Sequence, residues 1–143
     1  MDSGLPLGVV TFLLTDVEAS TRIWRDSPRA AALMARQAEL IAAAIARHGG
    51  VRPADQGEGD SVLAVFVRPG AALAAALDAQ RALTGEPWPE GESVRVRMAV
   101  HTGETELRDE RNYGGLALIR AARLRALARG GQVLVSNAPE AGG

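Results

Sequence analysis

Apolar and polar residues follow one another along the chain in patterns that predict several strands. An apolar run rich in β-branched residues, 8–15, predicts a buried strand. In residues 93–102, valine or methionine alternates with mostly polar side chains, which predicts a strand with one buried face. Two shorter runs, 51–55 and 61–67, predict a hairpin closed by a tight Gly-x-Gly turn, and residues 132–136 predict a last short strand.

Helical periodicity predicts three main helices between these strands. The first begins after good N-cap residues, with Pro28 in the first helical position, and ends at two glycines after about residue 48. The second, 71–83, is rich in alanine, and the third, 116–128, ends before another glycine pair. This order of elements predicts an α+β fold, a ferredoxin-like antiparallel sheet with helices on one face.

The length of 143 residues is that of a single domain. We expect a disordered lead-in over residues 1–7, the domain over 8–137, and a tail or linker to further domains over 138–143. The chain has no cysteine, which excludes disulfides and thiolate metal sites. All 16 basic residues are arginine, which excludes a P-loop lysine and a Schiff-base lysine.

Charge and hydropathy argue against nucleic acid and membranes as direct partners. A net charge of −1 and a pI near 6.1 argue against nucleic-acid binding through a general basic surface. No apolar run reaches the length of a membrane span, and the N-terminus lacks a signal pattern. We therefore expect a cytoplasmic protein that contacts neither a membrane nor nucleic acid directly.

Two acidic residues stand where strands end or begin. Asp16 follows the first strand and precedes a helical pattern, and Asp60 lies in the Gly-x-Gly turn before the strand 61–67. In the ferredoxin-like topology both come to the same sheet edge, and two carboxylates from different strands are the minimum for a two-metal phosphoryl-transfer site. Taken singly, Asp16 could merely cap a helix and Asp60 could merely form a turn.

Five blocks in order along residues 9–136 resemble the catalytic domain of class III nucleotidyl cyclases. The resemblance is strongest to the cyclase-like domains at the N-termini of bacterial multidomain transcription regulators. The blocks are FLLTDVEAST (12–21), HGG (48–50), GDSVLAVF (59–66), RMAVHTG (97–103), and RAARL (120–124) with GGQVLVS (130–136) downstream.

The resemblance implies an adenylate cyclase, which converts ATP into cyclic AMP and pyrophosphate by two-metal catalysis. Asp16 and Asp60 would bind two Mg²⁺ or Mn²⁺ ions, with the Val17 carbonyl as a further ligand. Arg97 would bind the pyrophosphate, and Arg123 would stabilise charge on the α-phosphate during ring closure.

The resemblance also implies how the nucleotide is held. Gln56 and Asn112 fall on the two positions that read the purine. The site would form only across a head-to-tail homodimer, with two equivalent sites. The backbone of the phosphate turn would cradle the β- and γ-phosphates at a helix start. The residues of this turn are Glu18, Ala19, Ser20 and Thr21.

Three departures from the family pattern bear on activity. Ile119 replaces the usual Asn that orients the ribose, a loss of a polar contact that typically costs on the order of 10²-fold in rate. Gln56 and Asn112 are amides in place of a Lys and Asp pair, which allows adenine but weakens discrimination against guanine. Ala19 replaces a frequent glycine in the phosphate turn, a milder change.

Three functions follow from these patterns. The first is a weak adenylate cyclase, which the retained Asp16, Asp60 and Arg123 favour. The second is a catalytically degenerate cyclase-like domain, which acts as a nucleotide-sensing or dimerisation module of a regulator. The third is a structural dimerisation domain without a small ligand. In each, Arg120 and Arg125, which flank Arg123 on other faces of the helix, are expected to be surface arginines.

Overall fold

The computed structural model describes residues 5–53, 60–109 and 112–137. Gln56, the tail 138–143 and the first four residues of the expected lead-in lie outside the described residues. The helices are α1 (Ser20–Asp26), α2 (Ala30–Arg47), α3 (Pro69–Gly85) and α4 (Leu116–Leu127). The strands are β1 (Val9–Val17), β2 (Ser61–Phe66), β3 (Val96–Glu104), β4 (Glu106–Leu107), β5 (Tyr113–Gly114) and β6 (Val133–Asn137).

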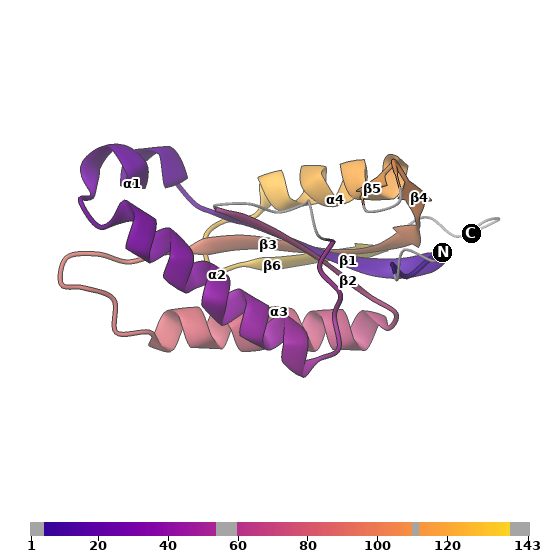
Figure 1. Ribbon diagram of the computed structural model, residues 1–143, viewed down its shortest axis with the longest axis horizontal. Coiled ribbons are helices and arrows are strands. Elements are labelled where there is room, and N and C mark those ends of the chain that lie inside the picture. Colours follow the sequence, from indigo (N-terminus) through magenta and orange to yellow (C-terminus); the bar gives the residue numbers. More distant parts are fainter. Residues whose placement is uncertain (1–4, 54–59, 110–111, 138–143) are drawn as a thin grey trace.

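The main sheet has the strand order β2-β1-β3-β6 (Figure 1). β1 is antiparallel to both of its neighbours, whereas β6 is parallel to β3. The predicted α+β class is therefore confirmed, but the sheet is mixed rather than wholly antiparallel. A parallel pair needs a crossover connection, and α4 supplies it between β3 and β6. β4 and β5 form a separate two-stranded sheet.

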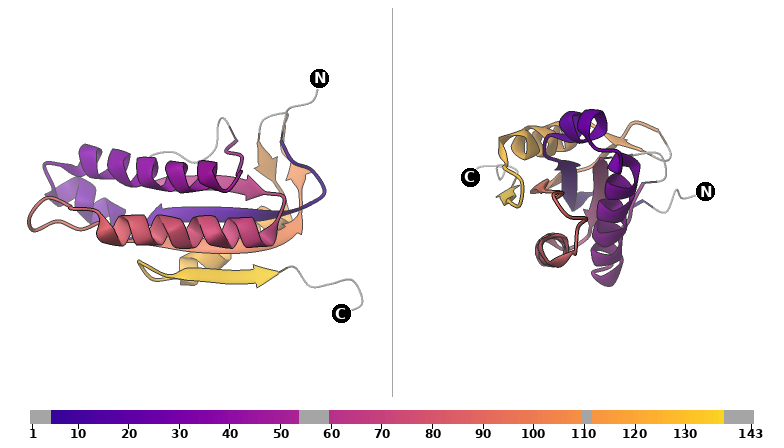
Figure 2. Two further views of the ribbon diagram at one scale, coloured as in Figure 1. Left: turned by 90° about the horizontal axis from the view of Figure 1, so that it is seen from below. Right: turned by 90° about the vertical axis from the view of Figure 1, so that its left-hand side faces the viewer.

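Helices cover both faces of the sheet (Figures 1 and 2), which corrects the expectation of helices on one face. Leu13 and Val17 of β1 pack in a core cluster with α2 and α3. Phe12 and Leu14, which alternate with them along the strand, pack in a second cluster with α4. The central strand is buried on both faces, which is why it reads as a continuous apolar run.

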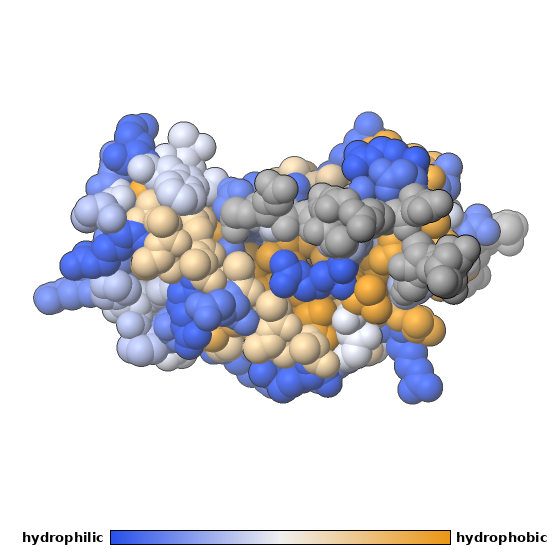
Figure 3. Space-filling model, in the orientation of Figure 1, coloured by the Kyte–Doolittle hydropathy of each residue, from blue (hydrophilic) through white to orange (hydrophobic). Residues whose placement is uncertain are grey.

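Small residues allow the helices to lie close to the sheet. The inward face of α3 is largely alanine, and α4 approaches β3 at Gly103. A β-carbon at Gly103 would lie 2.9 Å from the Ala117 Cβ, so this position needs glycine. Alanine also lines part of the exposed face of α2, which Figure 3 shows as a light orange band.

The predicted hairpin before β2 is present only as a bridge. Val51 pairs with Val65 through two backbone hydrogen bonds of 2.9 and 2.8 Å, and most of the predicted strand 51–55 lies beyond the bridge or outside the described residues. Among the described helices, none is long and apolar enough to cross a membrane.

Candidate active site

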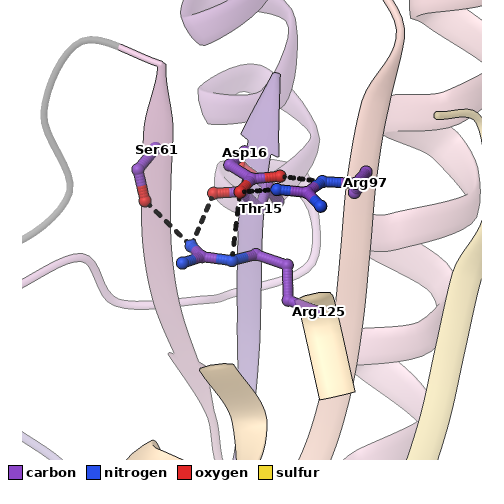
Figure 4. A network of polar contacts seen from close by, with 5 residues as sticks. All are labelled: Thr15, Asp16, Ser61, Arg97 and Arg125. Atoms are coloured by element: carbon purple, nitrogen blue, oxygen red, sulfur yellow. Dashed lines mark hydrogen bonds and ion pairs between the residues drawn. The ribbon is translucent and has the colours of Figure 1, made fainter. Parts of the chain in front are cut away.

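Three polar side chains stand in a row across the sheet, at the edge where β1 ends and β2 and β3 begin. Asp16 lies opposite Ser61 of β2 and opposite Arg97 of β3. Alternate residues of a strand share a face, so Asp16 lies on the same side as Phe12 and Leu14, the side that α4 covers. Directly paired residues of neighbouring strands also share a face, which places all three side chains under α4 (Figure 4).

Arg97 binds Asp16 through two parallel hydrogen bonds. Its Nε donates to Oδ1 at 2.7 Å and its Nη2 donates to Oδ2 at 2.5 Å. The hydrogen bond to Asp16 raises the pKa of the Arg97 guanidinium, burial opposes this rise, and the charges of Asp16, Glu18 and Asp60 add to it. Such a bidentate pair is a strong, oriented contact, and here it occupies both oxygens of the predicted metal ligand.

Arg125 reaches the same carboxylate from α4. Its Nη1 donates to the Thr15 carbonyl oxygen at 3.1 Å and to the Ser61 hydroxyl at 3.0 Å. Its Nε lies 3.5 Å from Asp16 Oδ2, and only 20% of the side chain is exposed. Burial lowers the pKa of Arg125, and the neighbouring Arg97 lowers it further. The expectation of a surface arginine was therefore wrong for Arg125.

The position of Arg125 follows from the packing of α4, which the structure shows and the sequence alone does not. Ala117 and Ala121 are the two buried residues of α4, and Arg125 follows them at the same spacing of four. Residues four apart lie on one helix face, so two buried alanines predict that the next residue of the stripe also points to the sheet. The apolar pattern of α4 is otherwise weak, because arginines occur around the helix.

Asp60 lies beside Asp16, as the topology predicts. The Val17 N–H donates to the Asp60 carbonyl oxygen at 3.0 Å, which fixes the start of β2 next to the end of β1. The negative charge of Asp60 raises the pKa of both Arg97 and Arg125, so the electrostatic environment of the two guanidinium groups includes this carboxylate. Both predicted metal-binding acids and Val17 thus come to one edge.

The donor atoms at this edge suit a hard divalent cation. Carboxylates, a backbone carbonyl and a hydroxyl are the oxygen ligands that Mg²⁺ and Mn²⁺ prefer. In the part of the chain that the structure describes, no three His, Cys, Asp or Glu side chains gather into a metal-binding group. A metal ion would also have to replace an arginine at Asp16.

The predicted phosphate turn joins β1 to α1. Ala19 is the N-cap of α1 and has a left-handed backbone, with φ 57°, which explains the glycine that is frequent there in the family. The Glu18 N–H already donates to the Arg95 carbonyl oxygen at 2.8 Å. A cavity of about 480 Å³ opens beside this turn, lined in part by Arg22 and Arg95.

Asn112 directly precedes β5, and Figure 1 shows β5 at the opposite end of the sheet from α1, the helix that follows Asp16. Its side-chain NH₂ donates to Asp109 at 3.1 and 3.2 Å, and its backbone N–H donates to the same carboxylate at 2.9 Å. The Asn112 Oδ1 is buried without a hydrogen-bond partner among the described residues. One protomer therefore does not bring Asn112 together with Asp16.

Ile119 and Arg123 share the outward face of α4. Ile119 is 48% exposed, and Arg123, one turn later, is exposed as well. Their side chains lie on a different face of the helix from Arg125. The structure thus separates the predicted residues into a group around Asp16 and an outward group that does not reach it within the same protomer.

Comparison with known proteins gives relatives of two kinds. No family model matches the chain. An uncharacterized protein of Mycobacterium tuberculosis is 46% identical over 134 residues, which cover 93% of this chain. The chain spans 44% of the length of that relative.

Solved structures of cyclases resemble the chain over most of its length. An adenylate/guanylate cyclase/hydrolase from Silicibacter pomeroyi is 31% identical with a TM-score of 0.71, and the match covers 92% of this chain and 76% of the other. An adenylate cyclase from Trypanosoma brucei, solved in its monomeric state, has a TM-score of 0.82 over 90% of this chain and 72% of the other. At 24% identity the second match shows the shared fold alone.

Proposed function

The chain belongs to the class III nucleotidyl cyclases, and we propose that it is an adenylate cyclase with low activity. The reaction converts ATP into cyclic AMP and pyrophosphate. One observation carries the proposal: Asp16 and Asp60 reach the same sheet edge from different strands, beside the two guanidinium groups of Arg97 and Arg125. Two acids and two fixed cations match the needs of a reaction at a triphosphate.

Ring closure forms a bond between the ribose 3′-oxygen and the α-phosphorus, while the bond to pyrophosphate breaks and the 3′-hydroxyl loses its proton. Two Mg²⁺ or Mn²⁺ ions, held by Asp16, Asp60 and the Val17 carbonyl, would neutralise phosphate charge and lower the pKa of the attacking hydroxyl. Arg97 would exchange its contact with Asp16 for one with the departing pyrophosphate, for which its planar fork is suited.

A head-to-tail homodimer would complete the site. Ile119 and Arg123 are exposed on the outward face of α4, and the Asn112 side chain is hydrogen-bonded to Asp109, so none of the three contacts Asp16 within its own protomer. In a two-fold dimer, the outward face of α4 from a second copy would bring Arg123 to the α-phosphate. Arg123 would then stabilise the charge that develops during ring closure. The backbone of the turn Ala19–Thr21 would bind the outer phosphates.

Asn112 supports adenine as the base. Because a carboxylate only accepts hydrogen bonds, the Asn112 NH₂ must be the group that faces Asp109, which leaves the amide oxygen as the remaining group. This buried oxygen has no donor among the described residues, and the 6-amino group of adenine is a donor. Guanine carries an acceptor at the same position, so we propose ATP as the substrate.

Ile119 favours a second candidate, a degenerate cyclase-like domain that senses nucleotide or mediates dimerisation. Isoleucine cannot hydrogen-bond a ribose, and Asp16 is already paired with Arg97. Such a domain would still need its fold and dimer, but would not need a productive metal site.

Cyclic-nucleotide formation tests the two candidates directly. The purified protein is incubated with ATP or GTP and with Mg²⁺ or Mn²⁺, beside Asp16→Asn and the control Glu39→Gln, an exposed acid on α2. We expect cyclic AMP from the wild-type protein and from the control, and about 10³-fold less from Asp16→Asn. Nucleotide binding without product in every protein would instead support the degenerate domain.

A further inference from the structure

Three oxygens converge on the guanidinium group of Arg125. They are the Thr15 carbonyl oxygen at 3.1 Å, the Ser61 hydroxyl at 3.0 Å and the Asp16 carboxylate at 3.5 Å (Figure 4). The first two come from neighbouring strands and the third from the predicted metal ligand. We call these three oxygens the Arg125 socket. The guanidinium group of Arg125 occupies it.

The Arg125 socket offers the ligands of a hard metal ion. A carboxylate, a carbonyl and a hydroxyl are the oxygen types that bind Mg²⁺ or Mn²⁺ in proteins. The charges nearby are already close to balance, because Asp16, Glu18 and Asp60 carry three negative charges and Arg97 and Arg125 carry two positive ones. A divalent cation added to this group without nucleotide would leave an excess of positive charge.

We propose that Arg125 is an internal counter-cation, which fills the Arg125 socket when no metal is bound and competes with divalent metal for Asp16. The inference rests on the proposed function, in that it takes Asp16 as a metal ligand. It adds a residue that sets metal affinity from within the same protomer. Metal would bind weakly to the protein alone and more tightly with a triphosphate, whose negative charge balances both cations.

Arg125 is the arginine that is suited to leave when metal binds without nucleotide, since Arg97 has no pyrophosphate to exchange Asp16 for in that state. Arg97 is anchored on β3 and makes two short bonds to Asp16, of 2.7 and 2.5 Å. Arg125 contacts Asp16 only through one ion pair of 3.5 Å, and its other two partners are neutral oxygens. Its long side chain extends from α4, so it can swing away without moving a strand.

Titration of the protein with Mn²⁺ alone, followed by the electron paramagnetic resonance of free Mn²⁺, tests this inference. The variant is Arg125→Gln, and its matched control is Arg120→Gln, which removes the same charge from an exposed position of the same helix. We expect the Kd of Arg125→Gln for Mn²⁺ to fall roughly tenfold, as removal of one charge near a divalent ion at water-like screening predicts. Arg120→Gln should bind as the wild type does.

If the inference is correct, the tighter Mn²⁺ binding of Arg125→Gln requires Asp16. In the double variant Asp16→Asn with Arg125→Gln, the tighter binding should disappear. An unchanged Kd in Arg125→Gln, an equal gain in Arg120→Gln, or a gain that survives Asp16→Asn would each overturn the inference.

A measurement on the wild-type protein guards against a variant that fails to fold. In protein labelled with ¹⁵N-arginine, saturating Mg²⁺ should shift the Arg125 Nε–H resonance and leave that of Arg120 in place. Metal binding without this shift would overturn the inference. Both measurements omit nucleotide, so absence of cyclase activity would overturn only the proposed reaction.

Discussion

The inward face of α4 makes its contacts within one protomer, whereas the outward face is exposed. On the inward face, Ala117 and Ala121 are buried against the sheet, and Arg125 reaches Asp16 within one protomer. On the outward face, Ile119 and Arg123 are exposed and do not reach Asp16. One helix of 12 residues thus carries a face that packs on its own sheet and an exposed face that, in the proposed dimer, serves a second copy. The two faces can therefore be tested by separate experiments.

Mixing two inactive variants tests whether the outward face serves a second copy. Asp16→Asn and Arg123→Ala should each lower cyclase activity by about 10³-fold, because one removes the proposed metal ligand and the other the arginine proposed to stabilise charge on the α-phosphate. In an equimolar mixture about half of the dimers are heterodimers, and each has one intact site of two. Activity of the mixture should therefore return to roughly a quarter of the wild-type value.

The control mixture combines Asp16→Asn with Asp60→Asn. Each protomer of the heterodimer then lacks one of the two proposed metal ligands, so neither site is intact and activity should stay low. A mixture of Asp16→Asn and Arg123→Ala that remains inactive, although both proteins dimerise, would contradict the shared site.

Ile119→Asn should raise the activity. Asparagine restores the polar group that orients the ribose in the family, and such a contact is worth on the order of 10²-fold in rate. Ile119 is half exposed, so the substitution should leave folding almost unchanged. The readout is kcat for cyclic AMP formation. Leu116→Asn, at another exposed position of α4, is the control and should give no gain. Equal rates for Ile119→Asn and the wild type would contradict the proposal that Ile119 limits the activity.

The sequence predicted the sheet edge better than it predicted the faces of α4. The position of Asp16 at the end of an apolar strand and of Asp60 before the next strand was sufficient to place both at one edge. The parallel β6 and the position of α4 on the second face were not predictable in this way, because the order of elements does not specify which strands pair. The helix carries arginines on several sides, so only the packed sheet distinguishes Arg125 from Arg123.

A substitution at Ala121 tests whether α4 packs on the sheet through its inward face, and the readout is stability rather than activity. Ala121 is fully buried, so Ala121→Leu would force extra volume between α4 and the sheet and should lower the free energy of unfolding by about 1–3 kcal/mol. Ala126→Leu adds the same side chain at an exposed position of the same helix and should change it by less than about 0.5 kcal/mol. Urea unfolding of both variants gives the comparison. Equal losses would show that α4 does not pack through this face.

The inward face should also be sensitive to alkali at its N-terminal end. Tyr113 is buried beside Ala117, contacts Phe12 edge-to-face at 5.4 Å between ring centroids, and donates its hydroxyl to the Pro6 carbonyl oxygen at 2.7 Å. Burial raises the pKa of Tyr113 to about 12. Since the neutral phenol is favoured in the folded state, the stability it contributes is complete below the unfolded pKa of about 10. That stability is lost as the pH rises from about 10 through 12.

The composition makes this alkaline transition unusually easy to assign. The chain has one tyrosine, no lysine and no cysteine, so a tyrosinate signal in this range belongs to Tyr113. Tyrosinate absorbance at 295 nm should rise near pH 12 in the folded protein and near pH 10 in urea. Thermal stability of the wild type should fall over this interval, and that of Tyr113→Phe should stay level. Ionisation near pH 10 in the folded protein would contradict the burial of this end of the helix–sheet interface.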